Sequence, residues 1–436
     1  MPAGGLTYIA YALLALLLPS SGGDLSLVRR ELPDGLTAIV CARPARGLAA
    51  VDIWVRAGSA HERADEYGAA HFLEHLLFKG TSRRKPGEID AEIERMGGML
   101  NAGTIRDAAH LFAVVPSERV SDALDVMHDA LFGSVLAEDQ VELERRVILD
   151  ELARSDDDIH QTLADAAFQI AWGDHAYGRP VLGRSADIGA IMRESIHAFY
   201  RRLYRTDRMA VIVVGDVDEE AVHRSIARVF GNAGLATPPE RDQSEQENGA
   251  DPRRSSGPVL LKQRASRSPL ALWAWGVAKP QATARSEGGP NDAILAELAS
   301  EIVRDAIARS PGAGSVQGDA VGLQRGAMMY VWSELPETGI KAMASAVDAV
   351  TRRLVRDGPS AAEVEAARRR LLGRRLYRIE TVQGLAREIG VWWMLGDAQA
   401  ALDLPKRLMS LTRSDVQAFV TRCTAGRDRS GEPPPP

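Results

Sequence analysis

The sequence predicts an α+β protein built from two similar halves. Segments typical of strands and segments typical of helices follow one another irregularly along the 436 residues, without the strict βαβ alternation of a doubly wound sheet. Several helical segments of the first half recur in the same order about 220 residues later. The length also fits two or three domains of about 150 residues each, every one large enough for a core.

Composition excludes several classes of protein. Hydrophobic residues make up 45% and charged residues 26% of the chain, which is ordinary for a globular protein and not for a disordered one. The formal net charge of −6 argues against a nucleic-acid binder, and two cysteines cannot form a disulfide framework. All nine histidines lie between His61 and His223. A histidine-dependent site is therefore expected in the first half.

The N-terminal residues 1–24 form a possible signal or leader segment. Residues 6–18 are an apolar run of 13, too short to span a membrane but long enough for the apolar part of a secretory signal. However, no Lys or Arg precedes the run and no Ala-x-Ala cleavage site follows it, so a buried or frayed segment, or a start codon placed too early, is the alternative. We expect a periplasmic or secreted protein if the segment is a signal peptide, and a cytoplasmic one otherwise.

The elements expected in the first half follow from local patterns. Strands are favoured at residues 27–43 and 49–56, with turns at residues 33–35 and at Pro44. Apolar periodicity and terminal glycines then predict the later elements. These are helices at residues 68–78, 86–96, 120–131 and 138–152, and strands at residues 110–115 and 209–214.

The domain boundaries follow from composition. Residues 25–233 are expected to form the first domain, and residues 234–257, rich in Pro, Ser, Gln, Glu and Asn, an inter-domain linker. Residues 258–426 would form the second domain, and the GEPPPP end, within residues 427–436, a disordered tail.

The two halves look like copies of one unit. Residues 116–152 resemble residues 335–376, and ESIHAFYRRLY (194–204) is echoed by SDVQAFVTRC (414–423). Chance similarity between amphipathic helices is the alternative. In this alignment Glu144 falls opposite Arg368 and Glu151 opposite Arg375, so the second copy has bases where the first has acids. We expect the basic segment around Arg368 to be a solvated face, or alternatively a subunit contact or a chamber lining.

One short motif carries the chemistry. The helix at residues 68–78 contains His71, Glu74 and His75 in the spacing H-x-x-E-H. At 100° per residue the two histidines are about 40° apart and Glu74 lies about 60° to the other side of His71. Both imidazoles can therefore reach one ion while the carboxylate stays beside it. A surface helix with two solvated histidines is the alternative.

Two histidines leave a zinc site short of a ligand, and we expect a carboxylate from a separate element to complete it. The helix at residues 138–152 offers Glu142, Glu144, Asp150 and Glu151. Glu144 and Glu151 are seven residues apart and so share a face to within about 20°. Zinc would lower the pKa of its water and polarise a carbonyl, and Glu74 would accept the water proton and pass it to the leaving amine.

The flanks of the motif resemble the pitrilysin/insulinase family of zinc peptidases, in particular its mitochondrial processing peptidase-like bacterial branch. The similar stretches cover the first half: GAAHFLEHLLFKGT (68–81), GGMLNAGT (97–104), ERRVILDE (144–151), HAYGRPVLG (175–183) and VVGDVD (213–218). The resemblance implies one Zn²⁺ held by His71, His75 and Glu151, with Glu74 as general base. It also implies that Glu144 is an auxiliary acid near the metal.

The resemblance further implies how substrate binds. Asn101 and Ala102 fall on the edge strand that pairs with an extended peptide, a mode that gives affinity with little side-chain selectivity. Two similar α+β halves would face each other across a chamber like a clamshell. Short or unfolded peptides would then be the substrates of a zinc metalloendopeptidase. Relatives of this length often pair as a homodimer or as a heterodimer with a homologous subunit; neither nucleic acid nor a stable membrane span is expected.

The second half departs from the family pattern. Active relatives usually supply an Arg and a Tyr from this half to hold the substrate. The corresponding region here is residues 300–318, and no tyrosine occurs between Tyr204 and Tyr330. Arg304 or Arg309 could replace the Arg. Either substrate binding is weakened, or a partner subunit supplies that part of the site. The alternative function is therefore a non-catalytic or assembly subunit that needs a homologous partner.

Overall fold

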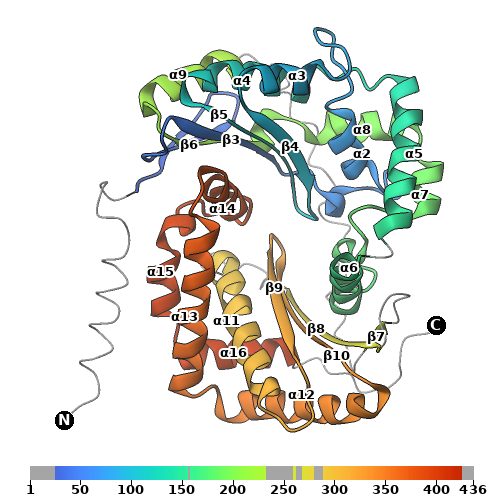
Figure 1. Ribbon diagram of the computed structural model, residues 1–436, viewed down its shortest axis with the longest axis vertical. Coiled ribbons are helices and arrows are strands. Elements are labelled where there is room, and N and C mark those ends of the chain that lie inside the picture. Colours follow the sequence, from blue (N-terminus) through green and yellow to red (C-terminus); the bar gives the residue numbers. More distant parts are fainter. Residues whose placement is uncertain (1–24, 156–157, 232–258, 262–267, 279–287, 425–436) are drawn as a thin grey trace.

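The computed structural model describes residues 25–155, 158–231, 259–261, 268–278 and 288–424 (Figure 1). These residues form two mixed α/β halves, each with its own sheet, and the predicted α+β class with two similar units is confirmed. The expected leader, linker and tail (residues 1–24, 234–257 and 427–436) lie outside the described residues. Within those residues no helix is long and apolar enough to cross a bilayer.

The first half is a six-stranded sheet with its helices. The strand order is β1-β2-β6-β3-β5-β4, and β2 and β6 are the parallel pair. The strands are β1 (Val28–Glu31), β2 (Thr37–Ala42), β3 (Leu48–Val55), β4 (Met99–Thr104), β5 (Ala109–Pro116) and β6 (Met209–Gly215). The helices are α2 (Ala69–Leu76), α3 (Glu88–Arg95), α4 (Val120–Gly133), α5 (Glu138–Ser155), α6 (Ile159–Trp172), α7 (Ser185–Ala190), α8 (Arg193–Leu203) and α9 (Glu219–Phe230).

The second half has a smaller, antiparallel sheet of order β7-β8-β10-β9. Its strands are β7 (Val259–Leu261), β8 (Leu270–Ala278), β9 (Gln317–Leu323) and β10 (Gly326–Glu334). Its helices are α11 (Gly288–Ala308), α12 (Glu337–Asp357), α13 (Ala361–Arg378), α14 (Val382–Met394), α15 (Ala400–Ser410) and α16 (Arg413–Thr424). The series β3, β4, β5, α4, α5, α6 thus recurs as β8, β9, β10, α12, α13, α14, about 220 residues later.

The elements predicted in the first half are present. The segment at residues 27–43 is a hairpin of β1 and β2, which turns at Gly35 with φ +88°. Strand β6 is buried at every position because helices cover both faces of the sheet there, as its continuous apolar run indicates. Helix α5 begins at Glu138 as predicted and continues to Ser155, three residues beyond the expected end.

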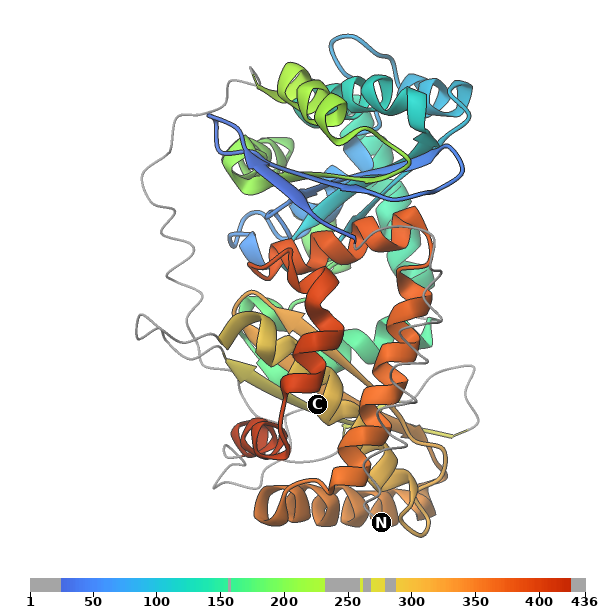
Figure 2. The ribbon, with the colours of Figure 1, turned by 90° about the vertical axis from the view of Figure 1, so that its left-hand side faces the viewer.

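Each half places one helix on the sheet of the other half. Helix α14 of the second half packs against β3 and β6, and helix α6 of the first half packs against β8 (Figures 1 and 2). At the first contact α14 approaches so closely that a Cβ on Gly390 would lie 2.0 Å from Trp54 Nε1. The two helices that cross to the other half occupy equivalent positions in the two copies: α6 directly follows α5 in the first half, and α14 directly follows α13 in the second.

Packing and hydrogen bonds join the halves. One apolar core contains Trp54 and Ile212 of the first half together with Trp273 and Trp393 of the second. The halves are therefore fused through a common core at α14, and the enclosed chamber implied by the resemblance stays a prediction.

The turn between β9 and β10 also binds the first half. Its backbone N–H groups at Gln324 and Arg325 donate to Asp107 Oδ2 at 2.9 Å and to the Tyr177 hydroxyl at 3.2 Å. Tyr177 in turn donates to Asp107 Oδ1 at 2.6 Å. This buried polar cluster fixes the second sheet against the loop that precedes β5.

Candidate metal centre

Helix α2 carries the two motif histidines and is held at its start. The helix follows Gly68, whose φ of +95° favours glycine, and a Cβ there would lie 2.3 Å from Ile188 Cδ1. The buried Glu62 accepts a hydrogen bond from the Ala70 N–H at 3.0 Å, which satisfies one of the free donors of the first turn. The buried face of the helix comprises Ala69, Ala70, His71, Phe72, Leu73 and Leu76.

Three donor atoms converge between α2 and α5. His71 Nε2 and His75 Nε2 are 3.3 Å apart, and Glu151 Oε2 lies 3.7 Å from the first and 3.5 Å from the second. Tetrahedral ligand atoms at 2.0–2.2 Å from a zinc ion are about 3.3–3.6 Å from one another. The donors therefore already have the spacing of a three-residue zinc site. Among the described residues these side chains form a group that could hold a metal ion.

The structure decides which acid of α5 faces the histidines. Glu142 is exposed and pairs with Arg145, and Asp150 is exposed as well. Glu151 reaches both imidazoles, whereas Glu144 is buried behind His75. Glu144 and Glu151 share one face of α5, as the seven-residue spacing predicts, and that face places Glu151 among the ligand atoms and Glu144 against the other side of His75.

Glu144 and Lys79 continue the site away from the histidines. His75 Nδ1 lies 3.0 Å from Glu144 Oε2, so the Nδ1–H donates and Nε2 stays free for a metal. Lys79 Nζ lies 2.9 Å from the other oxygen of Glu144, whose side chain is 2% exposed. A buried carboxylate is costly unless it is paired, and Lys79 supplies the pairing charge. His71 has no such support, because its Nδ1 is buried without a hydrogen-bond partner among the described residues.

The surroundings set the protonation of the group. Burial lowers the pKa of His71. Burial acts in the same sense on His75, but its hydrogen bonds to Glu151 and Glu144 prevail and raise the pKa of this imidazole. The hydrogen bond to His75 lowers the pKa of Glu151. An ionised carboxylate and a neutral His71 are forms in which these side chains bind zinc.

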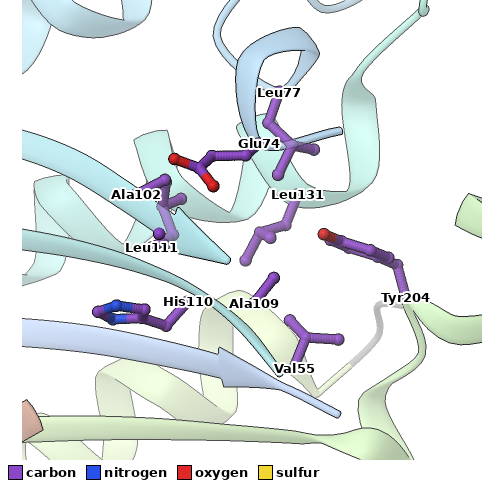
Figure 3. Close-up of a pocket in the computed structure, with 10 residues that line it drawn as sticks. Val55, Glu74, Leu77, Ala102, Ala109, His110, Leu111, Leu131 and Tyr204 are labelled. Carbon is purple, nitrogen blue, oxygen red and sulfur yellow. The ribbon is translucent and has the colours of Figure 1, made fainter. Parts of the chain in front are cut away.

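Glu74 lies beside the donor group and does not belong to it. Its half-buried side chain lines a small cavity next to Tyr204 and takes no part in the His71, His75 and Glu151 group (Figure 3). This position beside the ligands agrees with the helical-wheel argument from the motif.

Strand β4 lies beside the metal-binding helix and forms the outer edge of the sheet. Thr104 Oγ1 donates to the Ala70 carbonyl at 3.5 Å, linking the strand to α2. Asn101 is exposed, and its Oδ1 accepts a hydrogen bond from the Ala102 N–H at 2.8 Å. The expected edge position of both residues is confirmed, and their binding of substrate stays a prediction.

The second half fills the corresponding place with ion pairs. Between α11 and α13, the buried Glu301 accepts hydrogen bonds from Arg370 Nε at 2.7 Å and Arg374 Nη2 at 2.5 Å. Arg375, which is 2% exposed, binds Glu388 at 2.7 Å. Arg368 donates to the carbonyl of Leu411.

The expectation of a solvated basic face is therefore wrong for Arg375 and Arg368. Both side chains point into the second half, where Arg375 binds Glu388 and Arg368 binds the Leu411 carbonyl.

The two arginines considered as substrate contacts are also engaged. Arg304 binds Glu301 at 2.7 Å, and Arg309 binds Glu363 at 3.1 Å. Tyr330 is buried on β10, while Tyr377 on α13 is 80% exposed. Both tyrosines of the second half thus lie outside the segment 300–318.

Two residues near the site, Lys79 and Tyr204, were not predicted from the sequence. Lys79 follows His75 by four residues, so one further helical turn was a signal that it shares the side of His75. Tyr204 is 130 residues from Glu74, and no local pattern brings the two together. His110 is buried on β5 with its Nδ1 3.0 Å from Asp52 Oδ1.

Comparisons with known proteins agree with the geometry. Residues 39–185 match the insulinase family (Peptidase family M16), and residues 190–285 match the Peptidase M16 inactive domain. Together the two matches cover more than half of the chain.

Curated relatives carry protease names. A zinc protease of Mycobacterium leprae, named as uncharacterized, is 39% identical over 224 residues, 51% of this chain and 50% of that protein. One of Streptomyces coelicolor is 28% identical over 415 residues, 94% of this chain and 90% of that protein. The mitochondrial-processing peptidase subunit beta of Blastocladiella emersonii is 34% identical over 46% of this chain and 43% of its own. The match thus spans about half the length of the first and third relatives.

Solved structures share the fold. A protease from Helicobacter pylori superimposes with a TM-score of 0.77 at 20% identity, covering 91% of this chain and 96% of the other. An M16-like peptidase from Alicyclobacillus acidocaldarius gives 0.73 at 19% identity, covering 92% and 96%.

Proposed function

The chain belongs to the insulinase family (Peptidase family M16), and from this premise we propose that it is a zinc-dependent metalloendopeptidase that hydrolyses short or unfolded peptides. Relatives named zinc proteases support a metallopeptidase in general. The observation that carries the proposal is the triangle of donor atoms from His71, His75 and Glu151, with sides of 3.3, 3.5 and 3.7 Å.

His71, His75 and Glu151 would hold the ion and leave one side of it free, as catalytic zinc sites require. Zinc bound there would supply Lewis-acid polarisation of a peptide carbonyl and would lower the pKa of water. His75 is oriented for this role by Glu144 at 3.0 Å. The proximity supports an orienting function for Glu144 in addition to the auxiliary acid expected from the resemblance.

Glu74 is proposed as the general base. It is the remaining acid of α2 and lies beside the ligand group without belonging to it. From there its carboxylate would take a proton from the attacking water and give it to the leaving amine.

Strand β4 is proposed to bind the substrate backbone. It is an edge strand beside α2, and an extended peptide can add to such an edge through main-chain hydrogen bonds. Asn101 and Ala102 would then contact the peptide near the reacting bond. Because backbone pairing reads few side chains, the proposed substrates are a class of extended peptides.

A second candidate is an assembly subunit that acts with a homologous partner. The engagement of Arg304 and Arg309 within their own half, and the lack of a tyrosine at residues 300–318, favour it. A homodimer or a heterodimer would supply the missing contacts in trans. Relatives named mitochondrial-processing peptidase subunit beta are consistent with such a pairing.

The experiment measures zinc content and cleavage of a quenched peptide library for the chain alone and with an added homologue. The wild type should bind one zinc and cleave, Glu74→Gln should bind zinc without cleaving, and His71→Ala should lose stoichiometric zinc. Unchanged turnover in Glu74→Gln would remove Glu74 from its role. Zinc binding with cleavage only after addition of the homologue would favour the assembly subunit.

A further inference from the structure

A small cavity lies behind the proposed general base. It has a volume of about 10 Å³ and is lined mainly by apolar side chains, among them Val55, Leu77, Leu111 and Leu131 (Figure 3). Glu74 lines it from α2 and Tyr204 from the end of α8; in Figure 3 the Tyr204 hydroxyl points toward Leu131 and the Glu74 carboxylate lies near Ala102. His110 also lines the cavity, and its imidazole Nδ1 is already bound to Asp52.

The Tyr204 hydroxyl is a buried donor without a partner. The residue is 1% exposed, and its oxygen makes no hydrogen bond within the described residues. Buried hydroxyl groups are nearly always hydrogen-bonded, because an unpaired one loses the bonds it makes to water in the unfolded chain. Burial, and to a smaller extent the charge of Glu74, raise the pKa of Tyr204, which keeps the hydroxyl protonated and able to donate.

The cavity is the size of one water molecule. A water needs about 10–15 Å³ of such space and two or more polar partners. Here the lining includes one residue with a hydroxyl donor, Tyr204, and one with a carboxylate acceptor, Glu74, and is otherwise mainly apolar. We propose that one ordered water occupies this cavity, accepts a hydrogen bond from the Tyr204 hydroxyl and donates one to the carboxylate of Glu74.

The consequence is a positioning role for Tyr204. A glutamate side chain has several rotatable bonds, and a half-buried one on a helix can point in more than one direction. A water held by Tyr204 fixes one oxygen of Glu74 from behind and leaves the other for the reacting water. This kinetic role rests on the proposed function of Glu74, whereas the water site itself does not.

The kinetic test compares Tyr204→Phe with a matched variant, Tyr200→Phe. The Tyr200 hydroxyl is also buried, but it donates to the Leu131 carbonyl at 2.6 Å. Tyr204→Phe should lower kcat about tenfold through loss of orientation, with KM and zinc content unchanged. Tyr200→Phe should lower the Tm and leave kcat as it is. An unchanged kcat in Tyr204→Phe, or an equal fall in both variants, would overturn the positioning role.

The structural test is independent of turnover. High-resolution crystal structures of the zinc-loaded wild type and of Tyr204→Phe should show a water between Tyr204 and Glu74 in the first and none in the second. An empty wild-type cavity, in maps that resolve other buried waters, would overturn the water site. The wild type could contain the water while Glu74→Gln keeps full turnover. That pair of results would uphold the water site and refute only the proposed role of Glu74 as general base.

Discussion

At the scale of single residues, the site depends on a row of charges that extends beyond the metal ligands. In space, His75 Nδ1 contacts Glu144 Oε2 at 3.0 Å, and the other oxygen of Glu144 contacts Lys79 Nζ at 2.9 Å. Each member fixes the next, because Glu144 can orient the imidazole only while its own buried charge is balanced. The metal-binding strength of His75 therefore depends on a lysine that touches no ligand.

Replacing Lys79 by Met should weaken zinc binding. Loss of the ammonium group leaves Glu144 buried without its cation and free to turn from His75, and loss of such outer partners typically costs about 10–100-fold in metal affinity. We expect about tenfold, measured by competition with a chromophoric chelator at pH 7. Lys79→Arg keeps the charge and should stay close to the wild type. An affinity equal to the wild type in Lys79→Met would contradict the charge row.

His61 should make the protein sensitive to acid. Burial, together with the charges of Arg208 and Arg325, lowers its pKa to about 3, so the folded chain keeps it neutral. When the pH falls below about 6.5, the ordinary pKa of histidine, His61 binds a proton in the unfolded chain but not in the folded chain. The free energy of unfolding therefore falls. At pH 5 this linkage amounts to about 2 kcal/mol.

The measurement is urea denaturation of the zinc-free protein at pH 7 and pH 5. The free energy of unfolding of His61→Gln should fall by about 2 kcal/mol less than that of the wild type over this interval. Substitution of the exposed His160 by Gln serves as the control and should keep the wild-type difference. An equal fall in the free energy of unfolding from pH 7 to pH 5 in all three proteins would show that His61 is not the group responsible.

At the scale of elements, one edge strand of each sheet, β4 and β9, carries the same local hydrogen bond. On β4 the Ala102 N–H donates to Asn101 Oδ1, and on β9 the Ala320 N–H donates to Asp319 Oδ1, each at 2.8 Å. The side chain thereby occupies a donor that another strand could use. Duplication preserved this detail, but β4 lies beside the metal-binding helix and β9 does not.

Ala102→Pro should separate substrate binding from folding. Proline removes the outward N–H, which a peptide added to the edge would need, and proline is tolerated on edge strands. We expect about a tenfold rise in KM for extended peptides with kcat and zinc content retained. Ala320→Pro makes the same change on β9 and should leave KM unaltered. A similar rise in both variants would point to a general loss of structure.

Local patterns predicted the strands β1, β2, β3, β5 and β6 and the helices α2 to α5 of the first half, but not β4 or the helices α6 to α9. Tertiary contacts account for the site residues that the patterns missed. The helix of His71 and His75 follows from spacing, since both donors lie on one helix. The choice among the acids of α5 could not follow from spacing, because it depends on how α5 crosses α2. The resemblance pointed to Glu151, and the distances agree. Tyr204 joins Glu74 only through the fold, beyond the reach of any periodicity.

At the scale of the whole molecule, the exchange of α6 and α14 makes the two halves depend on each other. Each sheet has one face covered by a helix from the other half, so neither half can bury its apolar surface alone. This arrangement could not be predicted from the sequence, because the apolar face of a helix does not specify which of the two sheets it packs against. We infer that the described chain unfolds as one cooperative unit and not as two domains.

Gly390→Ala tests this dependence at its closest contact. The new Cβ would lie 2.0–2.5 Å from atoms of the Trp54 indole, which forces α14 away from β3 at a cost of about 1–3 kcal/mol. Calorimetry should show a lowered Tm with a single transition, and zinc release should occur at the same temperature. Gly373→Ala on α13, where a Cβ meets nothing within 4 Å, should leave the Tm equal or higher. Two separated transitions in Gly390→Ala, with zinc retained through the first, would show instead that the metal-binding half is stable on its own.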